Sequence, residues 1–174
     1  SDRSLLPKVD ALYFDGISAT VRRDFPAAIE SYAAIVKLSS DTEKPRVLVD
    51  LGRAYENNND VNDAIKSYTE ASTRNPQYAT AYLRLGIVFG QQGDLAKALS
   101  SFETAESIYQ ALGNIEGRTE VIFRRGALFN KRNKLAEART QLEQALALAR
   151  ALQPDASSSG SQPGQSGVQG VPAS

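Results

Sequence analysis

The chain has 174 residues, 41% of them hydrophobic, and its 20 basic and 20 acidic side chains leave no formal net charge. This balance favours neither a nucleic-acid partner nor a membrane surface, and no apolar run approaches the roughly 18 residues that a membrane-spanning helix needs. Cys and His are both absent, which excludes thiolate and imidazole chemistry and the usual zinc sites, so we expect no enzymatic activity, no metal and no cofactor.

The first predicted elements are a short lead-in, residues 1–8, and a helical hairpin over residues 9–42. Small and apolar residues recur on each helix at the spacing of one face: Leu12, Gly16 and Ala19, then Ala28, Tyr32 and Ile35. Asp15 and Ala19 depart from the pattern of the later units, as expected for a terminal unit with one face in water. Asp24 and Pro26 mark the predicted start of the second helix.

Residues 45–78 carry the clearest copy of this hairpin. Its two apolar faces are formed by Leu48, Leu51, Gly52 and Tyr55, followed by Ala64, Tyr68 and Ala71. Small residues at Gly52 and Ala64 predict a close approach of the two helices. Between the helices, Asn58, Asn59 and Asp60 predict a turn with a left-handed Asn and an Asp60 cap, and Pro76 ends the second helix.

Two further units follow, residues 79–112 and residues 119–152. Two series of small residues fix where each unit begins. The glycines Gly16, Gly52, Gly86 and Gly126 are separated by 36, 34 and 40 residues, and the alanines Ala28, Ala64, Ala98 and Ala138 have the same intervals. Two independent landmarks therefore share one set of intervals. Residues 113–118 are extra and follow a second helix that is predicted to reach Leu112. In the fourth unit Arg125 takes the place of a Leu.

This pattern resembles the tetratricopeptide repeat. In residues 45–78 it consists of Leu-Gly, an aromatic residue, Ala, a second aromatic residue, Ala and Pro at fixed offsets. The resemblance implies an all-α fold, a right-handed α-solenoid of four hairpins and eight helices. We therefore predict one tetratricopeptide-repeat domain over residues 9–152. Residues 153–174 are rich in Ser, Gly, Gln and Pro and predict a flexible tail.

The last predicted helix, Leu135 to about Leu152, has no obvious helix after it to cover its outer face. Leu146 and Leu148 are expected to be bare on that face. Mild exposure of a few apolar side chains, self-association, and contact with a further domain or repeat all account for such a surface.

In stacked hairpins of this kind the first helices line a concave surface. Positions 2, 5, 6, 9, 12 and 13 of each unit should then face a groove, which includes Val49 and Leu83. The candidate ligand-binding residues among them are Tyr13, Asp50, Arg53, Asn57, Arg84, Ile87, Gln91, Arg124 and Lys131. The mixture of polar, aromatic and aliphatic side chains suits a peptide better than a metabolite.

The basic candidates leave two interpretations open. Arg53, Arg84, Arg124 and Lys131 could grip an acidic segment or a terminal carboxylate. Alternatively they are solvated helix charges, some of them paired with Asp50, Glu56 and Glu120. The pattern by which chaperone-binding relatives of the resembled family hold a terminal carboxylate does not match this sequence. The acidic run at residues 56–63 lacks the Gly and Glu of a calcium loop, which favours a turn and helix cap there.

The leading hypothesis is a non-catalytic scaffold that binds a protein or peptide segment in the concave groove, with no nucleic-acid partner and no membrane insertion. An alternative is the excised regulatory or sensing region of a larger bacterial enzyme or regulator, such as a protein kinase or a transcriptional regulator. The absence of any Met motivates this second hypothesis, because it indicates a processed or excised chain.

Overall fold

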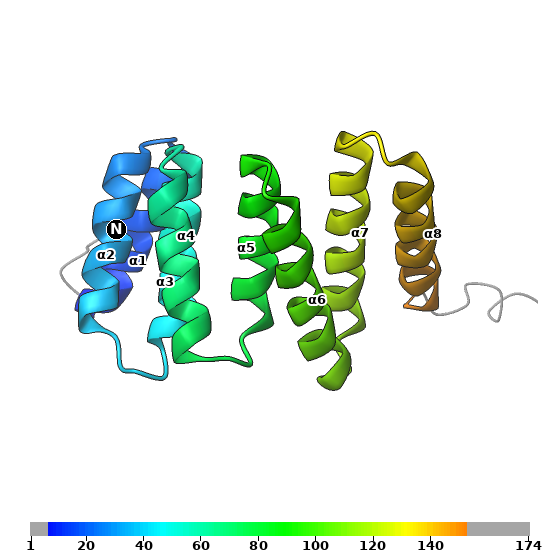
Figure 1. The fold of residues 1–174 in the computed structure, drawn as a ribbon. Helices are drawn as coiled ribbons and strands as arrows, with labels where there is room; N and C mark the ends of the chain where they lie inside the picture. Colours follow the sequence, from blue (N-terminus) through cyan, green and yellow to red (C-terminus); the bar gives the residue numbers. More distant parts are fainter. Residues whose placement is uncertain (1–6, 153–174) are drawn as a thin grey trace, which may run out of the picture.

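The computed structural model describes residues 7–152, and within that range all regular structure is α-helical. The eight helices, in chain order, are α1 (Lys8–Val21), α2 (Phe25–Leu38), α3 (Lys44–Asn57), α4 (Val61–Arg74), α5 (Ala79–Gln92), α6 (Leu95–Ala111), α7 (Ile115–Lys131) and α8 (Leu135–Ala151). They form a row of antiparallel pairs that runs from α1 and α2 at one end to α8 at the other (Figure 1). The predicted all-α solenoid of eight helices is confirmed.

Glycine and alanine set the distance between the two helices of each pair. A Cβ atom at Gly52 would lie 2.4 Å from the Tyr68 ring, and one at Gly86 would lie 2.5 Å from the Phe102 ring. The facing alanines, such as Ala64, are fully buried. The close approach predicted from these small residues is therefore present. An aromatic ring from the second helix fills the notch that the glycine leaves in the first three pairs, and Leu142 fills it at Gly126 in the fourth.

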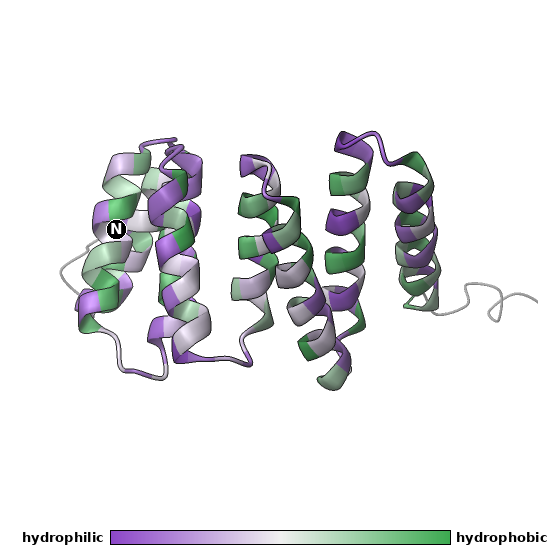
Figure 2. Cartoon of the chain, viewed as in Figure 1, coloured by the Kyte–Doolittle hydropathy of each residue, from purple (hydrophilic) through white to green (hydrophobic). Residues whose placement is uncertain are grey.

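The pairs are joined to one another by further apolar contacts, and hydrophobic and hydrophilic residues alternate along each helix (Figure 2). One cluster contains Leu48, Val49 and Tyr68 of the second pair together with Leu85 and Val88 of the third. Each pair therefore buries its apolar surface against its neighbour, as expected for stacked repeats.

A single left-handed residue turns the chain within each pair. The φ angles of these residues lie between 57° and 91°, and they occupy the same place in the four pairs: Arg23, Asn59, Gly93 and Asn133. Asn59 confirms the predicted left-handed Asn. The second helix starts after Asp24 as predicted, and the Asp24 side chain caps it by accepting a hydrogen bond from the Ala27 amide at 3.3 Å.

The predicted side-chain cap by Asp60 is wrong. Asp60 is the residue before α4, but its carboxylate makes no hydrogen bond to the helix amides. It accepts a hydrogen bond from the Asn58 side-chain amide at 2.7 Å instead, because both side chains sit on the same tight turn.

The six extra residues at 113–118 lengthen two helices. Both α6 and α7 have 17 residues, and α7 begins at Ile115, ahead of the start at residue 119 that the repeat spacing suggests. The added turn of α6 buries Tyr109, next to the buried Ile108. On α7, Gly117 makes room for the Tyr109 ring, since a Cβ atom there would lie 2.5 Å from it.

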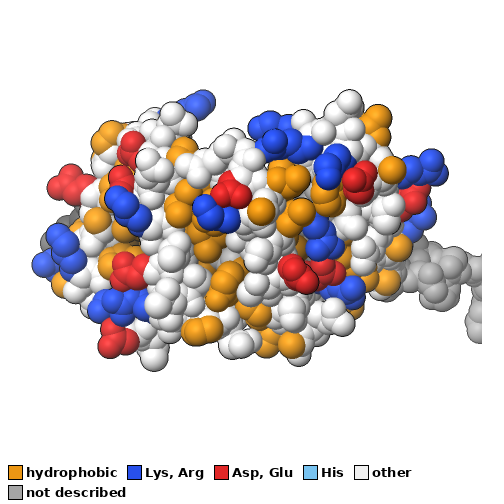
Figure 3. All heavy atoms as spheres, in the orientation of Figure 1, with side chains coloured by type: hydrophobic (Ala, Val, Ile, Leu, Met, Phe, Trp, Pro, Cys, Tyr) orange, Lys and Arg blue, Asp and Glu red, His pale blue; other side chains and the backbone are white. Residues whose placement is uncertain are grey.

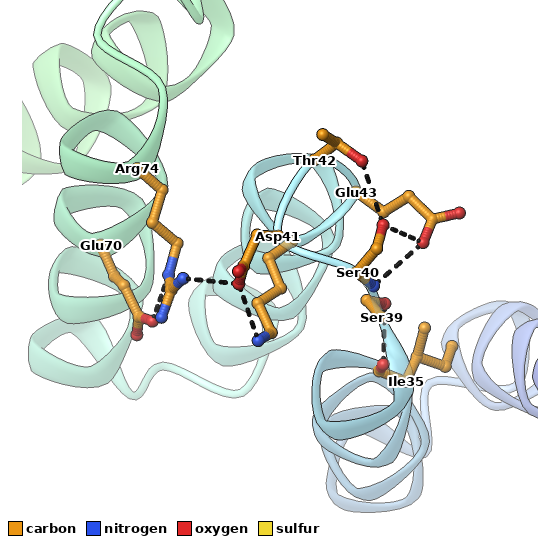
Figure 4. A network of polar contacts seen from close by, with 9 residues as sticks. Ile35, Ser39, Ser40, Asp41, Thr42, Glu43, Glu70 and Arg74 are labelled. Atoms are coloured by element: carbon orange, nitrogen blue, oxygen red, sulfur yellow. Dashed lines mark hydrogen bonds and ion pairs between the residues drawn. The ribbon is translucent and has the colours of Figure 1, made fainter.

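An exposed polar network holds the loop between the first two pairs (Figure 4). The Glu43 carboxylate accepts hydrogen bonds from the Ser40 amide at 3.1 Å and from the Ser40 hydroxyl at 2.6 Å. Asp41 pairs with Lys44 at 3.2 Å and with Arg74 at 3.4 Å, which connects the loop to the end of α4. Exposed pairs of this kind add little stability, so their effect is to orient the loop.

The end of the array beyond α8 is only partly described. The predicted flexible tail, residues 153–174, lies outside the described residues. On α8, Leu146 is 50% exposed, and Leu135 and Leu142 are exposed beside it, so the other described residues leave this face of α8 uncovered. Leu148, expected on that face, is half-buried. Self-association or a further domain at this surface stays a prediction.

Candidate functional site

The odd-numbered helices α1, α3, α5 and α7 form one face of the array, here called the groove face. Direct contacts link α3 to α5 and α5 to α7, so the first helices of successive pairs are neighbours on this side. Cavities open between them, among them one between α5 and α7 and one between α1 and α3. A further cavity of about 480 Å³ lies at the turn end of α3 and α5, lined by Glu56, Asn57 and Gln91 among others. The first two cavities collect most of the predicted binding residues.

The cavity between α5 and α7, the α5–α7 pocket, has a volume of about 270 Å³. Its floor includes Phe102 and Leu128, and its walls include the cationic side chains of Arg124 and Lys131. Four predicted groove residues meet here: Ile87, Gln91, Arg124 and Lys131. An apolar floor below a basic wall can hold a side chain that combines methylene groups with a negative charge.

The cavity between α1 and α3, the α1–α3 pocket, has a volume of about 200 Å³. The predicted residues Asp50, Arg53 and Asn57 line it together with Ile17, Thr20, Val21, Tyr32 and Ala54. Burial raises the pKa of Asp50 above its ordinary value, and the nearby Arg46 and Arg53 only partly oppose this effect. The carboxylate is therefore held in an environment that disfavours its charge.

Arg84, the predicted residue between the two pockets, has an internal partner. Its guanidinium lies 3.9 Å from the Glu56 carboxylate, which also accepts a hydrogen bond from the Tyr68 hydroxyl at 2.6 Å. Burial, reinforced by that hydrogen bond, raises the pKa of Tyr68 far above its ordinary value. Arg84 therefore conforms to the interpretation of a helix charge with a carboxylate partner.

The remaining predictions on this face have mixed outcomes. Tyr13 lies outside both pockets, beneath the Arg46 guanidinium, 5.4 Å from its ring centre. Val49 and Leu83 were predicted to face the groove, but both are buried in the core. The helices of neighbouring pairs pack closely at this position and cover it.

The sequence pattern assigned Gly86, Phe102 and Tyr32 to the core, yet each also lines a pocket. The signal that would have identified them is the repeat register. Both pockets use positions 9, 12, 13 and 24 of one unit and positions 6, 9, 10 and 13 of the next. A pocket at one junction therefore predicts an equivalent place at the others.

Charges of both signs are scattered among apolar side chains over the face of the molecule drawn in Figure 3, without a large patch of one sign. Residues 7–152 contain no group of three or more acidic side chains placed to hold a metal ion. Within the same described range, none of the helices is both long and apolar enough to cross a bilayer.

Comparisons with known proteins agree with the repeat pattern. A family model described as tetratricopeptide repeat matches residues 49–111. The chain is 26% identical over 98 residues to the photosystem I assembly protein Ycf3 of Rippkaea orientalis, a match that covers 56% of this chain and 57% of that protein. The chain thus spans less than two thirds of the length of this relative.

Two solved structures have a similar fold. The crystal structure of MamA superposes with a TM-score of 0.66 at 25% identity and covers 83% of this chain and 80% of MamA. The Sgt2 tetratricopeptide-repeat domain from Aspergillus fumigatus superposes with a TM-score of 0.58 at 20% identity, over 92% of this chain and 94% of that domain. The second likeness shows the fold alone.

Proposed function

Because the chain is a tetratricopeptide-repeat protein, we propose that it is a non-catalytic scaffold that binds an extended or helical segment of a partner protein along its groove face. The observation that supports this proposal is the pair of pockets at equivalent places on that face. Each pocket is too small for a typical metabolite but large enough for one or two side chains. Pockets of this kind, repeated along a groove, suit a peptide that presents a side chain to each.

The similarity to a photosystem I assembly protein supports a role in bringing proteins together. That similarity is low and partial, so the photosystem itself is not proposed as the partner of this chain. The alternative of a regulatory region from a larger enzyme or regulator stays a prediction, and no feature of the described residues favours it over the scaffold.

The test is a selection of binding peptides from a display library with the full chain as bait. Selected peptides are then titrated against Arg124→Gln combined with Lys131→Gln, which removes the basic wall of the α5–α7 pocket. The matched control is Lys66→Gln combined with Arg139→Gln, two exposed cations on α4 and α8. We expect the groove variant to weaken binding by roughly tenfold or more and the control variant to bind like the parent chain.

Two results would overturn the scaffold proposal. The first is a selection that yields no peptide with saturable binding. The second is binding that both double variants weaken equally, because a general charge effect and not the groove would then explain it.

A further inference from the structure

The three junctions between successive pairs offer the same place on the groove face, and the middle and last junctions differ in what fills it. Each place is formed by positions 8, 12 and 24 of one unit and position 6 of the next. At the middle junction these residues are Gly52, Glu56, Tyr68 and Arg84, and at the last junction they are Gly86, Gly90, Phe102 and Arg124. The middle junction therefore shows what occupies such a place when the chain fills it itself.

At the middle junction the occupant is a glutamate side chain. The Glu56 carboxylate accepts the Tyr68 hydroxyl hydrogen bond at 2.6 Å and lies 3.9 Å from Arg84 of the next pair. Its side chain is only 17% exposed. A carboxylate on short methylene groups thus fits between the two helices, with the guanidinium as its counter-charge.

At the last junction the corresponding glutamate is missing. Gly90 has no side chain at the position of Glu56, and Phe102 replaces Tyr68 and so has no hydroxyl to satisfy. Arg124 remains at the position of Arg84, and Lys131 adds a second cation to the wall. The vacant space between α5 and α7 is the α5–α7 pocket.

We propose that the α5–α7 pocket receives a glutamate side chain from the partner segment, in the place that Glu56 fills at the preceding junction. This inference rests on the proposed scaffold function and names the group that the groove recognises. The carboxylate meets Arg124 and Lys131, while its methylene groups lie over Phe102 and Leu128.

One internal group competes for the cation. Glu120 accepts a hydrogen bond from Arg124 Nε at 2.7 Å, one turn away on the same helix. Both side chains of this pair are more than 40% exposed, and exposed pairs of this type are weak. The guanidinium has further donors besides Nε, so the pair leaves Arg124 able to bind a second carboxylate.

The pocket can be closed from within by a single change. The backbone at Gly90 is helical, and a Cβ atom there would lie 3.1 Å from Leu128 Cδ1, the end of a flexible side chain. Gly90→Glu should therefore fold, place its own carboxylate near Arg124 and reproduce the arrangement of Glu56. Gly90→Ala is the matched control, because it adds only the Cβ atom and leaves most of the pocket open.

The probe is the blocked peptide acetyl-Ala-Leu-Glu-Leu-Ala-amide, titrated into the isotope-labelled full chain and followed by the shifts of the backbone amide signals. We expect saturable shifts at the amides of residues 86, 90 and 127 in the parent chain and in Gly90→Ala. In Gly90→Glu the same peptide should bind roughly tenfold more weakly or not at all. A peptide with Gln in place of Glu should produce no shifts at the pocket.

Other outcomes would overturn the inference. Equal shifts with the Gln peptide would show that the pocket does not recognise the carboxylate. Shifts that appear only with a Gln peptide ending in a free carboxylate would assign the pocket to a chain terminus. Shifts that occur only elsewhere on the groove face would reject the glutamate site in the pocket but leave the scaffold function intact. A failed library selection would instead reject the scaffold function, while the pocket could still respond to this probe.

Discussion

Asp50 shows how one side chain on the groove face can be held at a cost to stability. The pKa of its carboxyl is raised by burial, and Arg46 and Arg53 on the same helix lower it only in part. Burial raises the pKa of the Tyr13, Tyr32 and Tyr78 phenols, and the negative charge of Asp50 raises it further. Strained or desolvated charges of this type are typical of binding sites, where function outweighs stability.

We therefore expect Asp50→Asn to raise the melting temperature modestly at pH 7. A raised native pKa means that protonated Asp50 is favoured in the folded state, so the penalty is absent below the unfolded pKa of about 4 and develops as the pH rises through the native pKa. The gain should vanish near pH 3, as followed by thermal unfolding monitored by circular dichroism.

Asp94→Asn is the control of opposite sign. Hydrogen bonds from the Lys97 side chain and backbone lower the pKa of Asp94, so its stabilising effect is present above the unfolded pKa and is lost as the pH falls. This variant should lose stability at pH 7. A loss of stability in Asp50→Asn at pH 7 would contradict the interpretation of Asp50.

The sequence predicted which charged residues lie on the groove face, but not which ion pairs their side chains form. Helical periodicity was sufficient to place Asp50, Arg84 and Arg124 on one side. It could not show that Glu56 reaches Arg84, because that contact joins two helices of different pairs. The pocket floor also escaped prediction, since a buried ring such as Phe102 has the same sequence signal whether or not one edge borders a cavity.

Between neighbouring helices, the main departure from the repeat pattern is a half-buried ion pair. Arg125 stands where the second and third pairs have Leu51 and Leu85, and its guanidinium donates to Glu106 at 2.8 Å and to Gln141 at 2.6 Å. Glu106 also accepts from Arg118 at 3.2 Å. The Arg125 and Glu106 side chains are 17% and 16% exposed, so α6, α7 and α8 are joined here by polar contacts.

Glu106→Val is expected to lower the free energy of unfolding by about 1–3 kcal/mol, because Arg125 then stays half-buried without its carboxylate. Adding Arg125→Leu should recover at least half of that loss. The double variant recreates the apolar contact of the first junction, where Val36 and Leu51 share one cluster. Urea unfolding of the parent chain and of both variants measures the loss and its recovery.

The exposed pair of Arg139 and Glu143 on α8 provides the control, since both side chains are mostly in water. Glu143→Val should change the free energy of unfolding by no more than about 0.5 kcal/mol. If the double variant were less stable than Glu106→Val alone, the ion pair would not be replaceable by apolar packing. The sequence revealed the anomaly at Arg125, but not its partners, which come from two other helices.

For the array as a whole, the sequence predicted the order and number of the helices because each unit repeats the same local signals. The added turns of α6 and α7 were harder to place, because residues 113–118 interrupt the period and their effect depends on how Tyr109 packs on Gly117. The equivalence of the junctions is also a property of the array, and it is what distinguishes the filled place at Glu56 from the open one at Gly90.

Stacked repeats touch only their neighbours, so stability should vary along the row. Helices α3 and α5 each bury seven residues, whereas α1 and α8 each bury two. We predict that native-state hydrogen exchange, measured at increasing urea below the unfolding transition, will show α8 and α1 opening first and α3 to α5 last.

Closing the α5–α7 pocket with Gly90→Glu should slow exchange in α7, because the new carboxylate links α5 to Arg124, while Gly90→Ala should have a smaller effect. A single opening free energy shared by all eight helices, unchanged in Gly90→Glu, would instead mean that the array unfolds as one unit and that the vacant junction has no energetic consequence.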